Sequence, residues 1–500
     1  MKQFLFLVML LSIGVSGSIL VTPAAGVAVY YLFSMLRPQY LWQFQLTGYP
    51  AITWSFFLAA ASIGSYLLWS VGLLSYGKAE RSVMRYSPAF TFANKMMMFF
   101  AFWITLSFIF SNNRDVSEEW YGEYVKIFVM YFVAARVIRT PNQIWLLYMI
   151  FTICIAYIAF DENSVYVQNG GVVRFYKRGF ARLDNNGVGL MMALAMPMCY
   201  FAWEMTRRWY RWIFLFALVS IVHAVMITYS RGAMLSMFPA AIMIMLYTKK
   251  RLFYCLVLLV MTGLISVMAG KEIVARFSSI NTRENDLSWK SRETSWGIAK
   301  EIANDYPLVG AGIRCSGAEM LQRGADMEGR TIHSQYLQLA ADSGWIAMLI
   351  YIGTAGSAFL AMWTARRRLW KRTDPDSVRA VCILGGIECG LISFLVGGAA
   401  LSLEVFEPPY LLMLMGAQVL ALLKSSDTAV PEIQNYRQTK LPMPVPRPVG
   451  PPVQRYERPT PAGPASSKSV LAPPSSPRMP FNPWLKPKPP RRGTPGGGRS

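Results

Sequence analysis

Long uninterrupted apolar runs recur along this chain, and they restrict its fold more than any other feature of the sequence. Hydrophobic residues make up 54% of its 500 residues and charged residues only 15%. A helix crosses the roughly 30 Å hydrocarbon core of a bilayer with about 17 to 25 such residues. Runs of about this length occur at 51–74, 92–110, 122–138, 142–160, 183–204, 211–229, 232–248, 252–269, 343–364, 380–401 and 408–423. Because a segment in lipid must satisfy its own backbone polar groups, each run predicts a transmembrane helix.

The start of the chain adds one further apolar region, residues 4–36, which Pro23 interrupts. This region is too long for one straight span and short for two, so the sequence predicts about 12 or 13 spans. A Met-Lys start followed by an apolar run is typical of a signal peptide, but the apolar character continues to Met35 without a small-residue cleavage site. We therefore expect a retained anchor in an all-α polytopic membrane protein of about 12 transmembrane helices.

The net charge of +22 is distributed regularly along the chain. Basic residues gather in every second connection between the predicted helices, at 78–85, 136–139, 207–211, 249–251 and 366–372. The positive-inside rule places these connections in the cytoplasm. The intervening connections then face the other side, at 111–121, 161–182, 230–231, 270–342 and 402–407. The charge therefore reports topology, and we expect no nucleic-acid partner.

This topology divides the chain into five regions. They are an N-terminal transmembrane region at 1–90, a transmembrane core at 91–269, a large helical loop at 270–342, C-terminal transmembrane helices at 343–424 and a tail at 425–500. The tail carries 19 prolines and 12 Lys or Arg against 3 acidic residues, and it has too little apolar surface to fold. We expect a disordered cytoplasmic extension that is idle, held by anionic lipid or docked on a partner.

The loop at 270–342 has the charge balance of a folded lid, with 9 basic and 9 acidic side chains up to His333. Residues 291–304 carry apolar side chains at helical spacing on one face, namely Trp296, Ala299, Ile302 and Ala303. This helix must end before Tyr306-Pro307, and glycines punctuate the turn that follows. A second helix is predicted to begin near His333 and to continue into the span at 343–364.

Only two histidines occur, and their surroundings differ. His223 lies midway along an apolar run and is interpreted as a packed histidine of the bundle. His333 lies where the loop returns to the bilayer, so water reaches it. Its near-neutral pKa would let it accept or donate a proton at working pH, which makes it a candidate for acid-base chemistry at the membrane surface.

Arginines gather on the same outer face as His333. Arg174, Lys177 and Arg178 precede one span, and snorkelling to lipid phosphate explains them. Arg231 lies in a tight turn between two spans, against the charge pattern of the topology. A guanidinium binds two phosphate oxygens in a fixed geometry, which suits a pyrophosphate anchored to a lipid. Arg231 is therefore a candidate ligand for a diphosphate.

Several classes of site lack their signals in this sequence. The six cysteines show no disulfide or metal-thiolate spacing and are interpreted as small apolar side chains. No Gly-x-x-x-x-Gly-Lys phosphate loop occurs, so ATP-driven transport is unsupported. No zinc-type cluster of histidine and glutamate occurs, and we expect neither a metal nor another cofactor.

Four segments around the long loop together resemble the bacterial O-antigen ligase and polymerase superfamily. They are Ser-Arg-Gly-Ala at 230–233, Arg-Glu-Thr-Ser-Trp at 292–296, Tyr-Pro-Leu-Val-Gly-Ala-Gly at 306–312, and His-Ser-x-Tyr-Leu at 333–337 with Asp342-x-Gly344. The resemblance runs from roughly residue 90 to 425. The segment 397–410 is similar to the ligase-like branch associated with exosortase systems.

The resemblance implies a glycosyltransferase of the bacterial inner membrane with a periplasmic active site. Such an enzyme moves an undecaprenyl-diphosphate-linked glycan onto an acceptor hydroxyl, with inversion at the anomeric carbon and without a metal. By the same resemblance, His333 is the general base, and Arg231 and Arg292 bind the donor diphosphate. The candidate substrate contacts are Arg182, Asn185, Tyr336, Gly310, Gly312 and Asp342. Family members usually have glutamate in place of Asp342, which leaves the role of this carboxylate open.

Two alternatives remain at this point. A ligase and a polymerase share these motifs, and the acceptor that separates them is a lipid core, a polysaccharide or a protein. A lipid or glycan transporter is the rival class, because about twelve spans also suit a carrier. Carriers usually place their ionisable residues near the membrane midplane, whereas the polar residues here lie outside it.

Overall fold

The computed structural model describes residues 2–46, 54–77, 90–170, 179–181, 183–206, 208–248, 287–325, 332–401, 403 and 405–440. Within these ranges the regular secondary structure is helical, apart from a single isolated bridge between Phe180 and Leu183. The predicted all-α class is therefore confirmed. Several features predicted from the sequence lie outside the described residues. They are the span at 252–269, the tail from residue 441, Arg182, the cations Arg174, Lys177 and Arg178, and the basic connections at 78–85 and 249–251.

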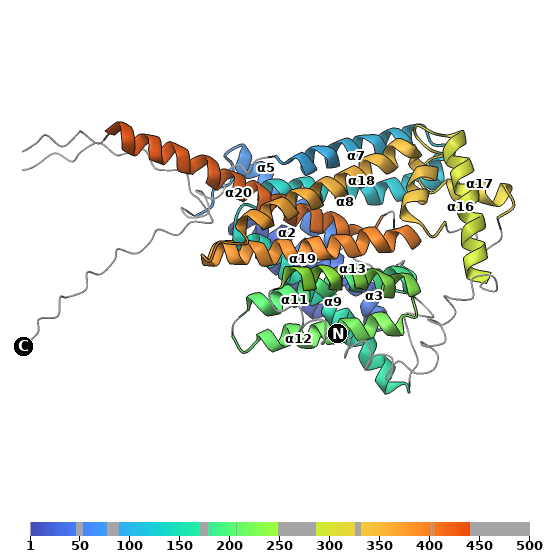
Figure 1. Cartoon of the computed structure of the whole chain (residues 1–500), viewed down its shortest axis with the longest axis horizontal. Coiled ribbons are helices and arrows are strands. Elements are labelled where there is room, and N and C mark those ends of the chain that lie inside the picture. Colours follow the sequence, from blue (N-terminus) through green and yellow to red (C-terminus); the bar gives the residue numbers. More distant parts are fainter. Residues whose placement is uncertain are drawn as a thin grey trace, which may run out of the picture.

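The long helices lie side by side in one bundle, and two helices of the long loop lie across one end of it (Figure 1). The loop helices are α16 and α17, and the end that they cover is called the lid end below. The helices are α1 (Lys2–Leu20), α2 (Pro23–Leu36), α3 (Pro38–Leu41), α4 (Gln43–Leu46), α5 (Trp54–Ser70), α7 (Phe92–Ile109), α8 (Arg114–Val137), α9 (Pro141–Gln168), α11 (Asn185–Met205), α12 (Arg211–Ile227), α13 (Arg231–Tyr247), α16 (Leu287–Asp305), α17 (Ser316–Gln322), α18 (Gln335–Leu369), α19 (Pro375–Gly397), η4 (Gly398–Ala400) and α20 (Glu407–Lys440).

Side-chain caps set where many of these helices begin. Asn113 accepts a hydrogen bond from the Val116 N–H at 3.3 Å, so α8 begins ahead of its apolar run at 122–138. Thr140 and Gln143 form a reciprocal capping box at the start of α9. Such caps satisfy backbone N–H groups that the first turn of a helix leaves without a partner.

The N-terminal apolar region forms two helices, α1 and α2, which pack against each other. Pro23 is the first residue of α2, where a proline costs no hydrogen bond, and Thr22 caps that helix. Six helices of the described residues are long and apolar enough to span a membrane, namely α1, α7, α9, α11, α18 and α19. The shorter α12 and α13 are apolar as well. The total of about 12 spans stays a prediction.

The C-terminal helix is longer than the sequence predicts. We placed the start of the disordered tail at residue 425, whereas α20 continues to Lys440. This part of the tail is poor in prolines, because Pro431 is the single proline between 425 and 440. Most of its residues therefore keep the backbone donors that a helix needs.

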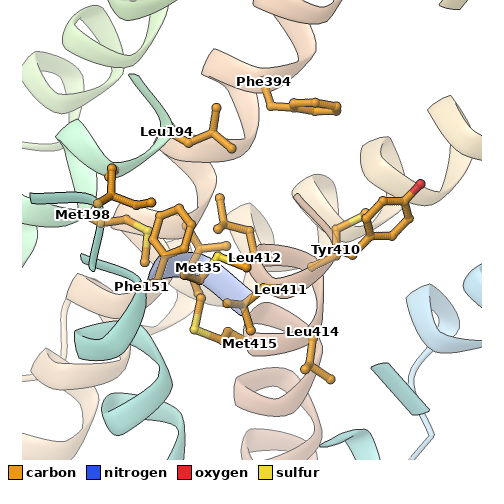
Figure 2. Close-up of a cluster of buried hydrophobic side chains, with 14 of the residues drawn as sticks. Met35, Phe151, Leu194, Met198, Phe394, Tyr410, Leu411, Leu412, Leu414 and Met415 are labelled. Carbon is orange, nitrogen blue, oxygen red and sulfur yellow. The ribbon is translucent and has the colours of Figure 1, made fainter. Parts of the chain in front are cut away.

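Small residues let the central helices approach closely. An added Cβ at Gly386 of α19 would lie 2.1 Å from the Tyr148 hydroxyl oxygen of α9, and one at Gly390 would lie 2.8 Å from the Leu194 carbonyl oxygen of α11. The first half of α20 fills the space beside them with large apolar side chains (Figure 2). This is the packing expected of helices that associate within lipid, where close backbone contact replaces the hydrophobic effect.

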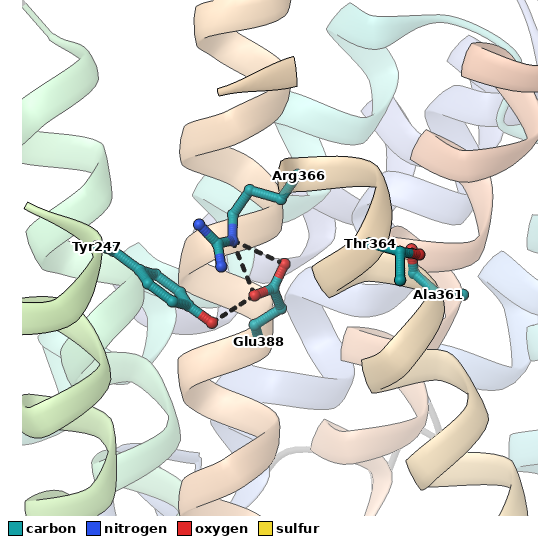
Figure 3. A network of polar contacts seen from close by, with 5 residues as sticks. All are labelled: Tyr247, Ala361, Thr364, Arg366 and Glu388. Carbon is teal, nitrogen blue, oxygen red and sulfur yellow. Dashed lines mark hydrogen bonds and ion pairs between the residues drawn. The ribbon is translucent and has the colours of Figure 1, made fainter. Parts of the chain in front are cut away.

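A buried ion pair and a tyrosine hydroxyl join three helices near the C-terminal end of α18 (Figure 3). Arg366 of α18 donates from Nε to Glu388 of α19 at 2.9 Å, and the Tyr247 hydroxyl of α13 donates to the same carboxylate at 2.6 Å. The Arg366 guanidinium also lies over the Tyr247 ring, 3.3 Å from its centre. Arg366 therefore has a packing role in addition to the topological one predicted for the cluster 366–372.

Candidate functional site

The predicted amphipathic helix of the long loop is confirmed as α16, which ends at Asp305 directly before Tyr306-Pro307. Its apolar face packs on a small core of its own, formed with side chains of α17 and α18. The core residues are Ile298, Ala299, Ile302, Ala311, Cys315, Met320, Ala325, Ile332 and Ala341. The Trp296 indole donates to the Ile332 carbonyl at 2.9 Å, which ties α16 to the chain just before His333.

The glycine-rich turn after α16 pairs with a kink in α18. Gly344 has φ 87°, which interrupts the helix and frees backbone groups around it. Ala311 N–H donates to the Ala341 carbonyl at 2.9 Å and Gly312 N–H to the Asp342 carbonyl at 3.0 Å. The turn therefore binds α18 through its backbone and fixes the lid on the bundle.

Gly310 and Gly312, which the family resemblance implied as substrate contacts, lie in this backbone interface. Their φ angles are 73° and 109°, in the region that favours glycine. An added Cβ at Gly310 would lie 2.2 Å from the Asp342 carbonyl carbon, and one at Gly312 would lie 2.0 Å from the Ser111 hydroxyl oxygen. Close packing against other parts of the protein therefore explains why glycine occupies both positions.

Asp342 is fully buried and also holds the lid. Its Oδ1 accepts from the backbone N–H of Ser316, the first residue of α17, at 3.0 Å, and its Oδ2 accepts from the Gln338 amide at 2.8 Å. A carboxylate at a helix N-terminus pairs with backbone donors and with the positive end of the helix dipole. These bonds favour a positioning role for Asp342 over a substrate contact.

His333 lies immediately before α18, which Ser334 caps. Its φ of 53° is uncommon for a residue with a side chain and marks a locally constrained backbone. The side chain is half-buried, and burial followed by the positive charge of Arg292 lowers the pKa of His333, against a smaller opposing effect of Asp184. The imidazole is therefore mostly neutral at pH 7 and able to accept a proton.

The same electrostatic interactions indicate which charged residues lie near enough to His333 to act on it. Arg292 of α16 and Asp184, which caps α11, both act on its charge. The family resemblance implied Arg292 and His333 as residues of one site, whereas Asp184 was not among the predicted site residues. Asp184 accepts from the Gly187 N–H at 2.7 Å, and an aspartate before Asn-Asn-Gly at the start of an apolar run is a recognisable cap signal.

Arg231 is the first residue of α13. The sequence had suggested that it lies within the tight turn between two spans. Ser230 caps the helix, and Tyr229 before it has a φ of 54°. Asn185, a predicted substrate contact, donates from Nδ2 to the Thr228 carbonyl at 2.9 Å. This amide nitrogen therefore fixes the turn that presents Arg231.

Residues 398–401 pack against both the start of α13 and the start of α18. An added Cβ at Gly232 would lie 3.6 Å from the Leu401 side chain, and one at Gly398 would lie 3.4 Å from the Cβ of Gln335. Tyr336, the last predicted substrate contact, donates from its hydroxyl to the Leu395 carbonyl at 2.5 Å. Its hydroxyl thus ties α18 to α19 in the structure.

The described residues contain no group of three or more His, Cys, Asp or Glu side chains arranged to hold a metal ion. At the lid end lie the half-buried imidazole of His333 and the guanidinium of Arg292, whose charge acts on it, and Arg231 is the first residue of α13. Such a site can accept a proton from a hydroxyl group and stabilise negative charge on a bound anion.

This fold and this site define a helical membrane protein of several spans whose polar site lies at one end of the bundle. Residues 216–352 match the protein family described as O-Antigen ligase, and this match supports membership of the O-antigen ligase superfamily. The matched region includes Arg231, Arg292 and His333. Comparison with curated proteins gives no match. Members of the family are glycosyltransferase-like enzymes that act on glycans.

Proposed function

We propose that this protein is an O-antigen ligase-like glycosyltransferase of the bacterial inner membrane. It moves a glycan from undecaprenyl diphosphate to an acceptor hydroxyl on the periplasmic side, at the lid end of the bundle. The observation that supports this proposal is the juxtaposition of Arg292 and the half-buried His333 within the matched region. The similarity of the segment 397–410 to the ligase-like branch favours a ligase over a polymerase.

In the proposed reaction a ring nitrogen of His333 takes the proton of the acceptor hydroxyl as its oxygen attacks the anomeric carbon. The bond between that carbon and the diphosphate oxygen breaks, and the lipid diphosphate leaves with the electron pair. Attack on the face opposite the leaving group inverts the anomeric configuration. Arg231 and Arg292 stabilise the negative charge that grows on the diphosphate, as preorganised donors do in other group-transfer sites.

A reconstituted transfer assay tests this proposal. Purified protein in liposomes receives an undecaprenyl-diphosphate-linked glycan and, in separate reactions, a lipid-core, a polysaccharide or a protein acceptor. We expect transfer to one acceptor in excess EDTA, with the new bond inverted relative to the donor by NMR. Strict dependence on a divalent ion would contradict the proposed arginine-based stabilisation, and glycan movement across the bilayer without transfer would favour the transporter.

The predicted topology gives a second test. Thr294 of α16 and Thr373, between α18 and α19, are both exposed and lie at opposite ends of the bundle. In intact cells with a permeable outer membrane, Thr294→Cys should react with an impermeant thiol reagent, and Thr373→Cys should react only after the inner membrane is opened. The wild-type chain is the background control, since its five described cysteines are buried. The reverse labelling pattern would place His333 on the cytoplasmic side and exclude the proposed reaction.

A further inference from the structure

Gln335, the first residue of α18, has a buried side chain with one half of its amide unused. The residue is 0% exposed, and its Oε1 accepts from the Leu403 backbone N–H at 2.6 Å. Its Nε2 has no hydrogen-bond partner among the described residues. A buried donor without an acceptor costs free energy, so an unsatisfied donor beside a candidate site suggests that a ligand supplies the acceptor.

The direction of this donor is fixed by chemistry. A backbone N–H only donates, so the amide oxygen of Gln335 must be the atom that faces Leu403. The alternative orientation, with oxygen and nitrogen exchanged, would set two donors against each other. The two N–H bonds of Nε2 therefore point away from Leu403 and stay available to another acceptor.

The surroundings of Gln335 favour an acceptor that carries negative charge. Gly398 and Leu403 contact Gln335, Leu401 lies close to Gly232, and Leu403 also lies against Gly187, so the starts of α11, α13 and α18 lie close together here. A helix N-terminus carries partial positive charge, which attracts anions. Arg231 begins α13, and His333 with Arg292 beside it lies just ahead of α18. The negative charge of Asp184 opposes this positive potential, although both of its carboxylate oxygens accept hydrogen bonds from α11.

We propose that Gln335 is a donor-binding residue, whose Nε2 donates a hydrogen bond to an oxygen of the lipid-linked diphosphate between Arg231 and His333. This inference rests on the proposed function and adds one residue that binds the donor diphosphate. An amide holds the diphosphate in one orientation without adding charge, because its own oxygen is anchored on Leu403. It thereby complements the two arginines, which supply charge.

The decisive variant is Gln335→Glu, assayed at pH 8. A glutamate keeps an oxygen for the Leu403 N–H but replaces the free donor by a second, negatively charged oxygen. Since a hydrogen bond to a charged group is among the stronger ones, we expect the affinity for undecaprenyl diphosphate in nanodiscs to fall about 10-fold to 100-fold. Donor KM should rise similarly, while the thermal midpoint of unfolding stays close to that of the wild type. Gln322→Glu, an exposed position at the end of α17, is the matched control.

Further arms separate the possible outcomes. Gln335→Met removes the donor without adding charge and should weaken binding in the same sense if the glutamate variant does not fold. Inorganic pyrophosphate should compete with undecaprenyl diphosphate, whereas phosphatidylglycerol in the nanodisc should not. Unchanged binding and donor KM in both variants would make Gln335 purely structural and overturn the inference. Gln335-dependent binding by a wild-type protein that transfers no glycan would instead overturn the proposed function alone.

Discussion

Replacing His333 by alanine is expected to lower the rate of glycan transfer by about 10² to 10⁴, the loss typical of a removed general base. The variant should still insert and fold, because His333 lies ahead of α18 and is not part of the hydrophobic core of the lid. The measurement is single-turnover transfer from the lipid-linked donor, with protein level and unfolding midpoint recorded in parallel. His223→Ala is the matched control, since that ring binds Asn163 within the bundle. Transfer at the wild-type rate by the His333 variant would remove this residue from the mechanism.

The pH dependence of transfer carries the electrostatic part of the same prediction. Burial and Arg292 lower the pKa of His333, so the base form persists to a pH below the ordinary histidine value and the rate falls only as the pH drops further. Arg292→Gln removes the positive charge, so the pKa of His333 should rise and the acidic limb of the profile should move to higher pH. Asp184→Asn should move that limb in the opposite direction. If the acidic limb of the profile stays in place in both variants, a group other than His333 controls it.

Local features of the lid could be predicted from the sequence because they depend on neighbours in the chain. Helical spacing within 291–304 and the proline at 307 were enough to define α16 and its end. The helix that begins after His333 and continues into the next span was predicted for the same reason. Arg292 on α16 and His333 before α18 then follow, because the family motifs fix where both residues occur in the chain.

The roles of Gly310 and Asp342 could not be predicted in this way. Their partners are distant in sequence, namely the kink of α18 for the glycine and the start of α17 for the carboxylate. Gln335 escaped notice for a similar reason, since its amide is fixed by Leu403 across the end of the bundle. Motifs identify residues that matter in a family, but only tertiary packing separates those that hold the lid from those that face a ligand.

Arg231→Lys is expected to reduce kcat/KM for the lipid-linked donor on the order of 10²-fold, the size of effect seen when one preorganised donor to a developing charge is lost. Lysine keeps the positive charge but is a single-point donor, whereas the guanidinium offers two parallel N–H bonds to phosphate oxygens. The turn that presents this residue is rigid, since Ser230 caps α13 and Asn185 anchors the Thr228 carbonyl. A flexible lysine therefore gains no second contact through movement of the backbone. Steady-state transfer at varied donor concentration measures the effect.

A conservative substitution is the informative one at this position, because it separates recognition of a diphosphate from simple attraction to the membrane. If Arg231 only extended toward lipid phosphate, lysine would serve equally well, since both side chains place an apolar stem along hydrocarbon and a charge in the headgroup region. Arg372→Lys, at an exposed position of the opposite end, provides that comparison and should leave transfer unchanged. Equal activity of both lysine variants would assign Arg231 to anchoring and leave Arg292 and Gln335 as the remaining candidates for the diphosphate.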